Sequence, residues 1–156
     1  MKAVVYYSLQ GNCEFVAAEI AKELDAKAIR LVPDVDPPKK GFGMFFKGGG
    51  MVVRKKTPNL VGFDFNADEY DTIVLCSPVW ASSYVPAFRT FFSKVDLSGK
   101  KVALVASSAG GDAVKMMDAM AQASGAEVVG RLSLVLPLKK QDEARKQIAE
   151  FCRTLG

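Results

Sequence analysis

The chain has 156 residues, with 21 Lys or Arg and 17 Asp or Glu, which gives a formal net charge of +4. Hydrophobic residues make up 49% and charged residues 24%, a balance that is typical of globular proteins and excludes a disordered or fibrous chain. The sequence contains no His, so it excludes catalytic triads that use His and zinc sites with His ligands.

The three cysteines, Cys13, Cys76 and Cys152, are too few and too far apart for a metal cluster or a disulfide framework, and we expect no metal site. Widely spaced cysteines in odd number indicate reduced thiols, which favours a cytoplasmic protein. The N-terminal residues have no secretory pattern, and no stretch approaches the roughly 20 apolar residues that span a membrane. We therefore expect no membrane insertion, and the small basic excess predicts no nucleic-acid binding.

Short apolar segments alternate with segments of helical periodicity along the chain. Residues 3–7 predict a buried strand, and an amphipathic helix follows from about Asn12. The further predicted strands span 28–32, 71–77, 101–107 and 127–135, and the further predicted helices span 86–95, 112–124 and 141–155. The strand at 71–77 is apolar without alternation, which indicates burial on both faces of a parallel sheet. This order predicts a single α/β domain over residues 1–156, with a doubly wound sheet and helices on both faces.

Residues 33–62 interrupt the alternation where a crossover helix is expected. This connection is rich in Gly and Pro, and we expect a helical turn or two within 43–54. Its net charge of +4 equals that of the whole chain, because two acidic residues, Asp34 and Asp36, stand against six basic ones: Lys39, Lys40, Lys47, Arg54, Lys55 and Lys56. Long connections in compact domains are usually functional or mobile. A basic segment folded over a cofactor would attract an anionic nucleotide or an acidic partner; the alternative is a solvated loop.

Three loops, at 8–13, 78–84 and 107–112, follow predicted strands at the carboxyl edge of the sheet, where doubly wound folds bind ligands. In the first loop, SLQGNC, Ser8 offers a hydroxyl, Gly11 permits close backbone approach, and Asn12 is suited to cap the next helix. Amides at a helix N-terminus form an anion-binding nest. The loop is neither a Walker motif nor a dinucleotide fingerprint, and the alternative is a plain capped turn.

The motif Ser8-x-x-Gly11-Asn12, followed by SPVWASSYVPAFRTFF after the third strand and SSAGGD after the fourth, resembles the flavodoxin family over essentially the whole chain. The resemblance implies a flavodoxin-like fold, with a five-stranded parallel sheet in the order 2-1-3-4-5 that binds FMN at its carboxyl edge. It implies a phosphate site formed by Ser8, Gln10, Gly11, Asn12 and Cys13. It also implies that the following residues of the other two loops flank the isoalloxazine: Pro78, Val79, Trp80, Ala81, Ser82, Tyr84, Ser107, Ser108, Gly110, Gly111 and Asp112.

Side-chain chemistry supports this assignment. Trp80 is the only tryptophan and offers a planar face for stacking, the alternative being a residue of the core or its rim. Tyr84 is a second aromatic candidate, and packing inward from the following helix is an equal alternative. Gly110 and Gly111 lack side chains, so their amides can approach a ligand edge; the alternative is a helix-entry turn beside Asp112.

The sequence departs from the family pattern at two places. Cys13 stands where many flavodoxins have Thr or Ser, and we expect it to be the most reactive of the three thiols because it begins a helix. The loop Ala81-Ser82-Ser83 replaces a Gly that many family members have, and residues with a Cβ disfavour positive φ. This predicts weak stabilisation of one-electron-reduced flavin and nearly two-electron behaviour.

The sequence thus favours an FMN flavoprotein that exchanges electrons with a partner protein or a small-molecule donor or acceptor, as a monomer or a homodimer. One alternative is a small FMN-dependent NAD(P)H or quinone reductase. A second alternative, from another class, is a flavin-less binding module. No residue is predicted to be catalytic.

Overall fold

The structure is a computed structural model that describes residues 1–36 and 57–156. The helical turn predicted within 43–54 and the six basic residues of the connection lie outside the described residues. Where the structure describes the chain, no helix is long and apolar enough to cross a membrane.

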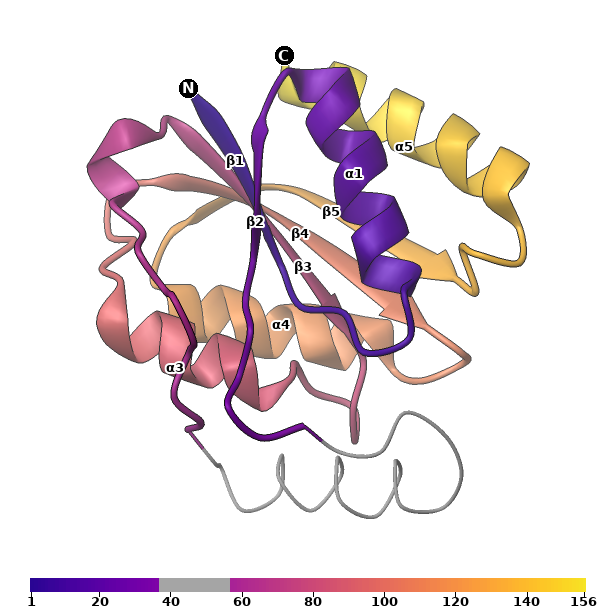
Figure 1. Cartoon of the computed structure of the whole chain (residues 1–156). Coiled ribbons are helices and arrows are strands. Elements are labelled where there is room, and N and C mark those ends of the chain that lie inside the picture. The colour runs from indigo at the N-terminus through magenta and orange to yellow at the C-terminus, as the bar shows by residue number, and fades with distance from the viewer. Residues whose placement is uncertain (37–56) are drawn as a thin grey trace.

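Five parallel strands form one sheet in the order β2-β1-β3-β4-β5, which confirms the predicted fold (Figure 1). The strands are β1 (Lys2–Tyr6), β2 (Lys27–Arg30), β3 (Thr72–Pro78), β4 (Lys101–Ser108) and β5 (Glu127–Val135). The central strand β3 is buried along all but its last residue, because helices cover both faces of a parallel sheet.

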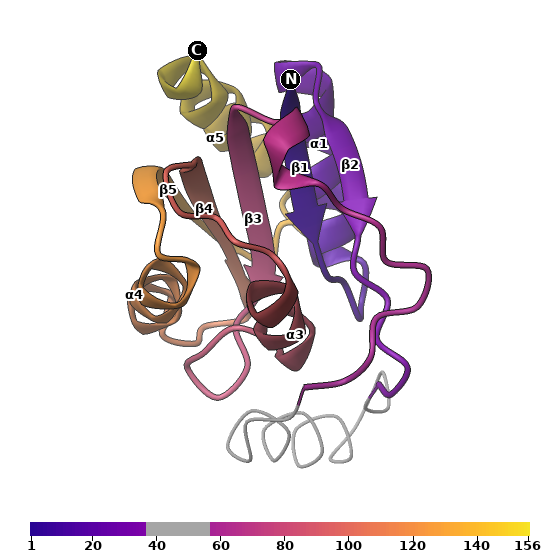
Figure 2. The same ribbon diagram turned by 90° about the vertical axis from the view of Figure 1, so that its left-hand side faces the viewer.

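The helices form the two outer layers. They are α1 (Asn12–Leu24), α3 (Pro86–Lys94), α4 (Ala113–Ser124) and α5 (Gln141–Leu155), with a short 3-10 helix, η1 (Ala67–Glu69). Helices α1 and α5 lie on one face of the sheet, and α3 and α4 lie on the other (Figures 1 and 2).

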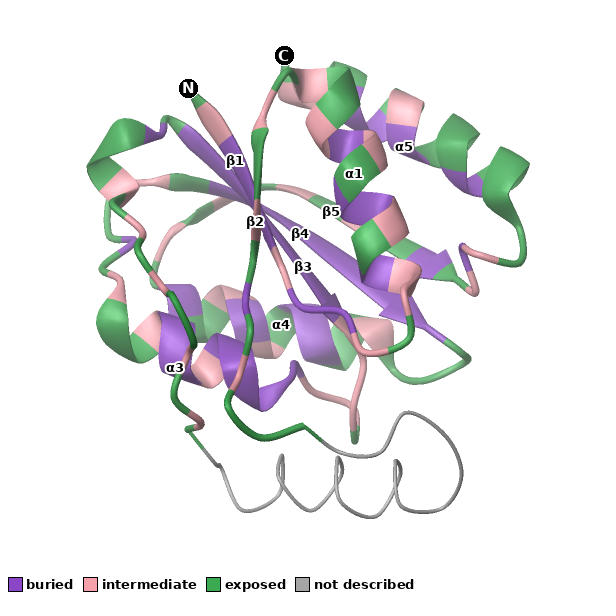
Figure 3. Ribbon diagram, viewed as in Figure 1, coloured by how far each residue is buried: buried purple, intermediate pink, exposed green. Residues whose placement is uncertain are grey.

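Successive residues of a strand face opposite sides of the sheet, so the core has two layers. Strands β3 and β4 between these layers are buried along most of their length (Figure 3). Val4 and Val74 pack in the layer under α1 and α5, and Val5 and Leu75 pack in the layer under α3 and α4. In the second layer, Phe91 of α3 is fully buried.

The two ends of the basic connection lie beside each other. Pro33 and Leu60 form an isolated antiparallel bridge, and the Asp34 amide donates to the Asn59 carbonyl at 2.9 Å. Thr90 Oγ1 of α3 donates to the Pro58 carbonyl at 2.6 Å. The connection therefore leaves and rejoins the fold next to α3.

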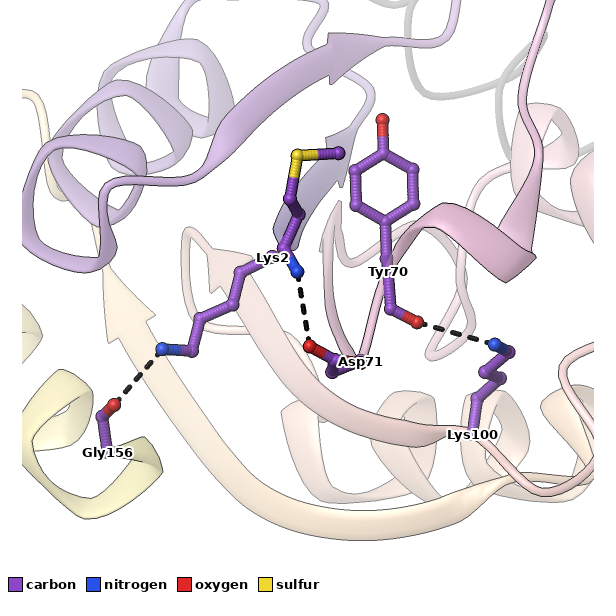
Figure 4. A network of polar contacts seen from close by, with 6 residues as sticks. Lys2, Tyr70, Asp71, Lys100 and Gly156 are labelled. Atoms are coloured by element: carbon purple, nitrogen blue, oxygen red, sulfur yellow. Dashed lines mark hydrogen bonds and ion pairs between the residues drawn. The ribbon is translucent and has the colours of Figure 1, made fainter.

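Polar contacts join the chain at the amino ends of the strands (Figure 4). Lys2 Nζ donates to the Gly156 carbonyl at 3.0 Å, and Lys100 Nζ donates to the Tyr70 carbonyl at 3.4 Å. The amino group of Met1 contacts Asp71 Oδ2 at 3.1 Å. These contacts lie at the edge of the sheet opposite to the strand ends that carry the predicted loops.

Candidate functional site

A cavity of about 490 Å³ opens at the carboxyl edge of the sheet, and its volume falls within the range of small-molecule sites. All three predicted loops contribute to its wall. The predicted residues that line it are Ser8, Gln10, Asn12, Cys13, Pro78, Val79, Trp80, Ala81, Ser107, Ser108 and Gly111.

Five predicted residues do not line the cavity: Gly11, Ser82, Tyr84, Gly110 and Asp112. Tyr84 is buried and its ring packs edge-on against Phe92, with centroids 5.4 Å apart, so the alternative of inward packing holds. Asp112 is the N-cap of α4, and its Oδ1 accepts the Lys115 amide at 2.9 Å. Its carboxylate therefore caps the N-terminus of α4.

The first loop is shaped by Gly11, which has a φ of 98° and is the N-cap of α1. Its amide donates to Ser8 Oγ at 3.1 Å, and its carbonyl accepts the Phe15 amide at 3.0 Å. The first turn of α1 thus begins at the cavity, where free amides and the helix dipole favour an anion.

Asn12 does not cap α1 as predicted, because it is already the first residue of the helix. Its Oδ1 instead accepts the Leu138 amide at 3.2 Å, which links loop 8–13 to the loop that follows β5. With Oδ1 occupied, Nδ2 is the group that Asn12 offers to a ligand. The hydroxyl of Ser8, which accepts from Gly11, likewise keeps its proton to donate.

The second loop turns back sharply after Trp80. Ala81 and Ser82 have φ values of 49° and 59°. Trp80 and Ser83 exchange two backbone hydrogen bonds, each 2.9 Å long. Positive φ at both central residues is the signature of a type I′ turn. Both residues therefore adopt positive φ in spite of the cost of a Cβ, because the paired hydrogen bonds hold the turn in this conformation. Weak stabilisation of one-electron-reduced flavin stays a prediction.

This strained turn gives a first prediction, for the protein without ligand. Replacing Ala81 by Gly should raise the free energy of unfolding by about 0.5–1 kcal/mol, because Gly adopts positive φ without the clash of a Cβ. Urea denaturation measures this change. The matched control is Ala18→Gly on the exposed face of α1, which should lower the stability by up to about 1 kcal/mol. Destabilisation by Ala81→Gly would contradict the turn conformation.

Trp80 lies half-buried in the cavity wall. Its ring packs at 88° against Tyr7, with centroids 5.4 Å apart. The Tyr7 hydroxyl donates to Asp36 Oδ1 at 2.5 Å, and burial together with this hydrogen bond raises the pKa of Tyr7 far above its ordinary value. Tyr7 therefore stays neutral, and its ring supports the position of Trp80.

A fourth loop reaches the cavity, and sequence reasoning missed it. Leu136 lines the cavity with a φ of 48°, and its amide donates to the Ser108 carbonyl at 2.9 Å. Leu138 lies against the first loop, since a Cβ on Gly11 would stand 3.3 Å from Leu138 Cδ1. The sequence could have indicated this loop, because it follows the last predicted strand, and β5 ends at the same edge of the sheet as β1, β3 and β4. Two neighbours of predicted residues, Leu9 and Ala109, also line the cavity.

All three thiols are buried. Cys13 is only 1% exposed and packs in the layer under α1 and α5, which disfavours rapid reaction of its thiol. That Cys13 is the most reactive of the three stays a prediction. Its side chain hydrogen-bonds with Cys76, and this contact together with burial raises the pKa of Cys76. Burial also raises the pKa of Cys152, to about 11. Within residues 1–36 and 57–156, no group of His, Cys, Asp or Glu has a metal-binding arrangement.

Comparisons with known proteins agree with this geometry. A family model described as Flavodoxin matches residues 1–143. A flavoprotein of Lactobacillus acidophilus, solved in complex with FMN, superimposes with a TM-score of 0.75 at 19% identity, covering 90% of this chain and 97% of that one.

Two further structures share the fold. The two-electron reduced flavodoxin of Megasphaera elsdenii gives a TM-score of 0.62 at 24% identity, covering 97% of this chain and 98% of that one. General stress protein 14 of Treponema denticola, in complex with FMN, gives a TM-score of 0.61 at 10% identity, covering 97% of this chain and 95% of that one. No curated protein sequence matches the chain. The family match spans nine-tenths of the sequence and coincides with the strand order and the loop motifs, so the chain belongs to the flavodoxin family.

Proposed function

We propose that this protein binds FMN in the carboxyl-edge cavity and transfers electrons through it. The observation that carries the proposal is the joining, in one cavity, of an anion-binding helix N-terminus with an aromatic wall. FMN has a single terminal phosphate and a planar ring, which match these two features. When bound, the flavin supplies the redox chemistry, and the protein supplies binding and orientation.

The residues of the first loop fit a phosphate. In the proposed complex, the backbone amides of loop 8–13, the Ser8 hydroxyl and Asn12 Nδ2 donate to its oxygens. Charge-assisted hydrogen bonds of this type are stronger than neutral ones. Gln10 and Cys13 also line the cavity, and Cys13 is buried.

The second and third loops fit a flat ring. Trp80 offers its indole as a stacking surface, and the hydroxyls of Ser107 and Ser108 offer polar groups at the β4 end. A Cβ on Gly111 would stand 3.1 Å from Val79 Cγ1, so the backbone at Gly111 packs closely against the other loop. The second and third loops are therefore packed together at the site.

The FMN complexes of two proteins with this fold support the choice of cofactor. The family supports electron transfer as the reaction. We further infer that the partner is a redox protein or a small-molecule donor or acceptor, and that the protein acts in the cytoplasm, which the three free cysteines support.

A titration of apoprotein with FMN tests the cofactor assignment. Because Trp80 is the only tryptophan and lines the cavity, FMN should quench the protein fluorescence and the flavin fluorescence together with a stoichiometry of one. The Trp80→Phe variant removes the tryptophan signal and should still quench the flavin. If FMN at micromolar concentration leaves both signals unchanged, a flavin-less binding module replaces the proposal.

A second measurement tests the reaction itself. FMN-loaded protein that has been reduced anaerobically with dithionite and freed of the excess should, when mixed with cytochrome c, produce reduced haem, seen by its absorbance. Apoprotein treated in the same way and freed of dithionite is the control. Equal haem reduction by the loaded protein and the apoprotein would contradict electron transfer through the flavin.

A further inference from the structure

The phosphate loop contains no basic residue, but the fold brings one to it from another strand. Arg30 is the last residue of β2 and pairs with Tyr6 of β1, two residues before Ser8. Its Nη2 donates to the Ser8 carbonyl at 2.9 Å, and its Nη1 lies 3.4 Å from Glu14 Oε2. Its guanidinium also lies 6.0 Å from the centre of the Tyr6 ring. One side chain therefore joins β1, the loop and the first turn of α1.

The contact with Ser8 bears on the direction of the loop. A carbonyl oxygen carries partial negative charge and would repel a bound anion. The Ser8 carbonyl is directed towards Arg30 by its hydrogen bond with the guanidinium, and Ser8 Oγ accepts a hydrogen bond from the Gly11 amide. This arrangement fixes the residue that begins the loop at both of its oxygens.

The contact with Glu14 bears on the charge of the site. Glu14 lies in the first turn of α1, where an acidic side chain stabilises the free helix but opposes a phosphate at the same end. No other charged side chain lies in residues 8–14. The Arg30 guanidinium thus pairs with the one charged side chain of residues 8–14, next to the proposed phosphate position.

We propose that Arg30 is a positioning residue for phosphate recognition, which fixes the Ser8 carbonyl and neutralises Glu14 without itself being part of the loop. This inference rests on the proposed FMN binding. It predicts that Arg30 distinguishes flavins that carry a phosphate from those that do not. A purely structural role would change the affinity for both kinds of flavin alike.

The test compares FMN with riboflavin, which has the same ring and no phosphate. Arg30→Met keeps the length of the side chain and removes its charge. It should weaken FMN binding about tenfold, because the Ser8 carbonyl is released and the negative charge of Glu14 is left unpaired beside the phosphate, and change riboflavin binding less than about twofold. Arg30→Lys keeps the charge but not the two-pronged geometry, and should give an intermediate loss for FMN. Fluorescence titration measures each dissociation constant.

The double variant Glu14→Gln/Arg30→Met measures how much of the affinity lost in Arg30→Met comes from the unpaired charge of Glu14. With the carboxylate removed, the affinity for FMN should return to within about threefold of wild type. The difference between wild type and Arg30→Met should also shrink as salt rises, because both partners are partly exposed and salt screens them.

The matched control is Arg131→Met. Arg131 lies on β5, the other edge strand, pairs with Asp118 at 2.7 Å, and has a side chain 40% exposed against 43% for Arg30. This variant should bind both flavins as wild type does. Thermal unfolding of all variants shows that they are folded.

The inference is overturned if Arg30→Met weakens FMN and riboflavin by the same factor, or weakens neither. A double variant no better than Arg30→Met would overturn the neutralisation of Glu14. These outcomes differ from failure of the proposed function, in which wild-type protein binds neither flavin.

Discussion

Replacing Phe91 by Ala should lower the free energy of unfolding by about 3–5 kcal/mol, the largest stability change that we expect from a single substitution. Phe91 is fully buried in α3. Its ring contacts Phe65 at 5.4 Å, Phe88 at 5.9 Å and Phe63 at 6.0 Å between centroids. The substitution therefore leaves a cavity at the junction of α3 with the segment that follows the basic connection.

Thermal unfolding checks this prediction, since about 1 kcal/mol shifts the midpoint by roughly 2–4 °C in a protein of this length. The control is Phe92→Ala, one residue further along α3. Phe92 is half-buried, so the loss of apolar contact is smaller and the destabilisation should be clearly less. Equal effects of the two substitutions would mean that Phe91 does not occupy the core of this layer.

Replacing Gly11 by Ala should weaken FMN binding by about 10- to 100-fold, the largest effect on binding that we expect, equivalent to roughly 1.4–2.8 kcal/mol. Gly11 has a φ of 98°, which strains a residue with a Cβ. The new methyl group would also stand 3.3 Å from Leu138 Cδ1, so that the loop or Leu138 must shift. Either shift misdirects the amides that are proposed to hold the phosphate.

Gly99→Ala separates this effect from general instability. Gly99 has a φ of 77°, lies just before β4 at the opposite edge of the sheet, and has open space around the position of a Cβ. Both substitutions should cost about 1–2 kcal/mol of stability through backbone strain. Only Gly11→Ala should change the dissociation constant for FMN. If the two variants bind FMN equally well, loop 8–13 does not hold the phosphate.

The sequence predicted the strands and helices because most of them have a strong local pattern, the weakest being that of β2. The unbroken apolar run at 71–77 indicated a strand buried on both faces, and the structure buries β3 in this way. The apolar spacing after Asn12 predicted the helix that became α1. The strand order itself followed from family resemblance, since periodicity alone does not state which strands are neighbours. The loops at the carboxyl ends of β1, β3 and β4 were identifiable because parallel strands bring their ends to one edge.

Other features depend on contacts between segments that are distant in sequence, and only the tertiary structure decided them. Trp80 of the cavity wall packs against Tyr7, which lies 73 positions earlier in the chain. Cys13 is buried against Cys76 by the packing of α1 on the sheet, which a helix-start pattern does not reveal.

The same reason explains the residues of the site that sequence reasoning missed. Asn12 bonds with Leu138, 126 positions later, instead of capping its own helix. Arg30 reaches Ser8 because β2 pairs with β1. Local sequence therefore determined which elements form and where the cavity opens. The packing of β2, β5 and their loops against the first loop determined which side chains complete its wall and its charge, because those contacts exist only once the sheet is assembled.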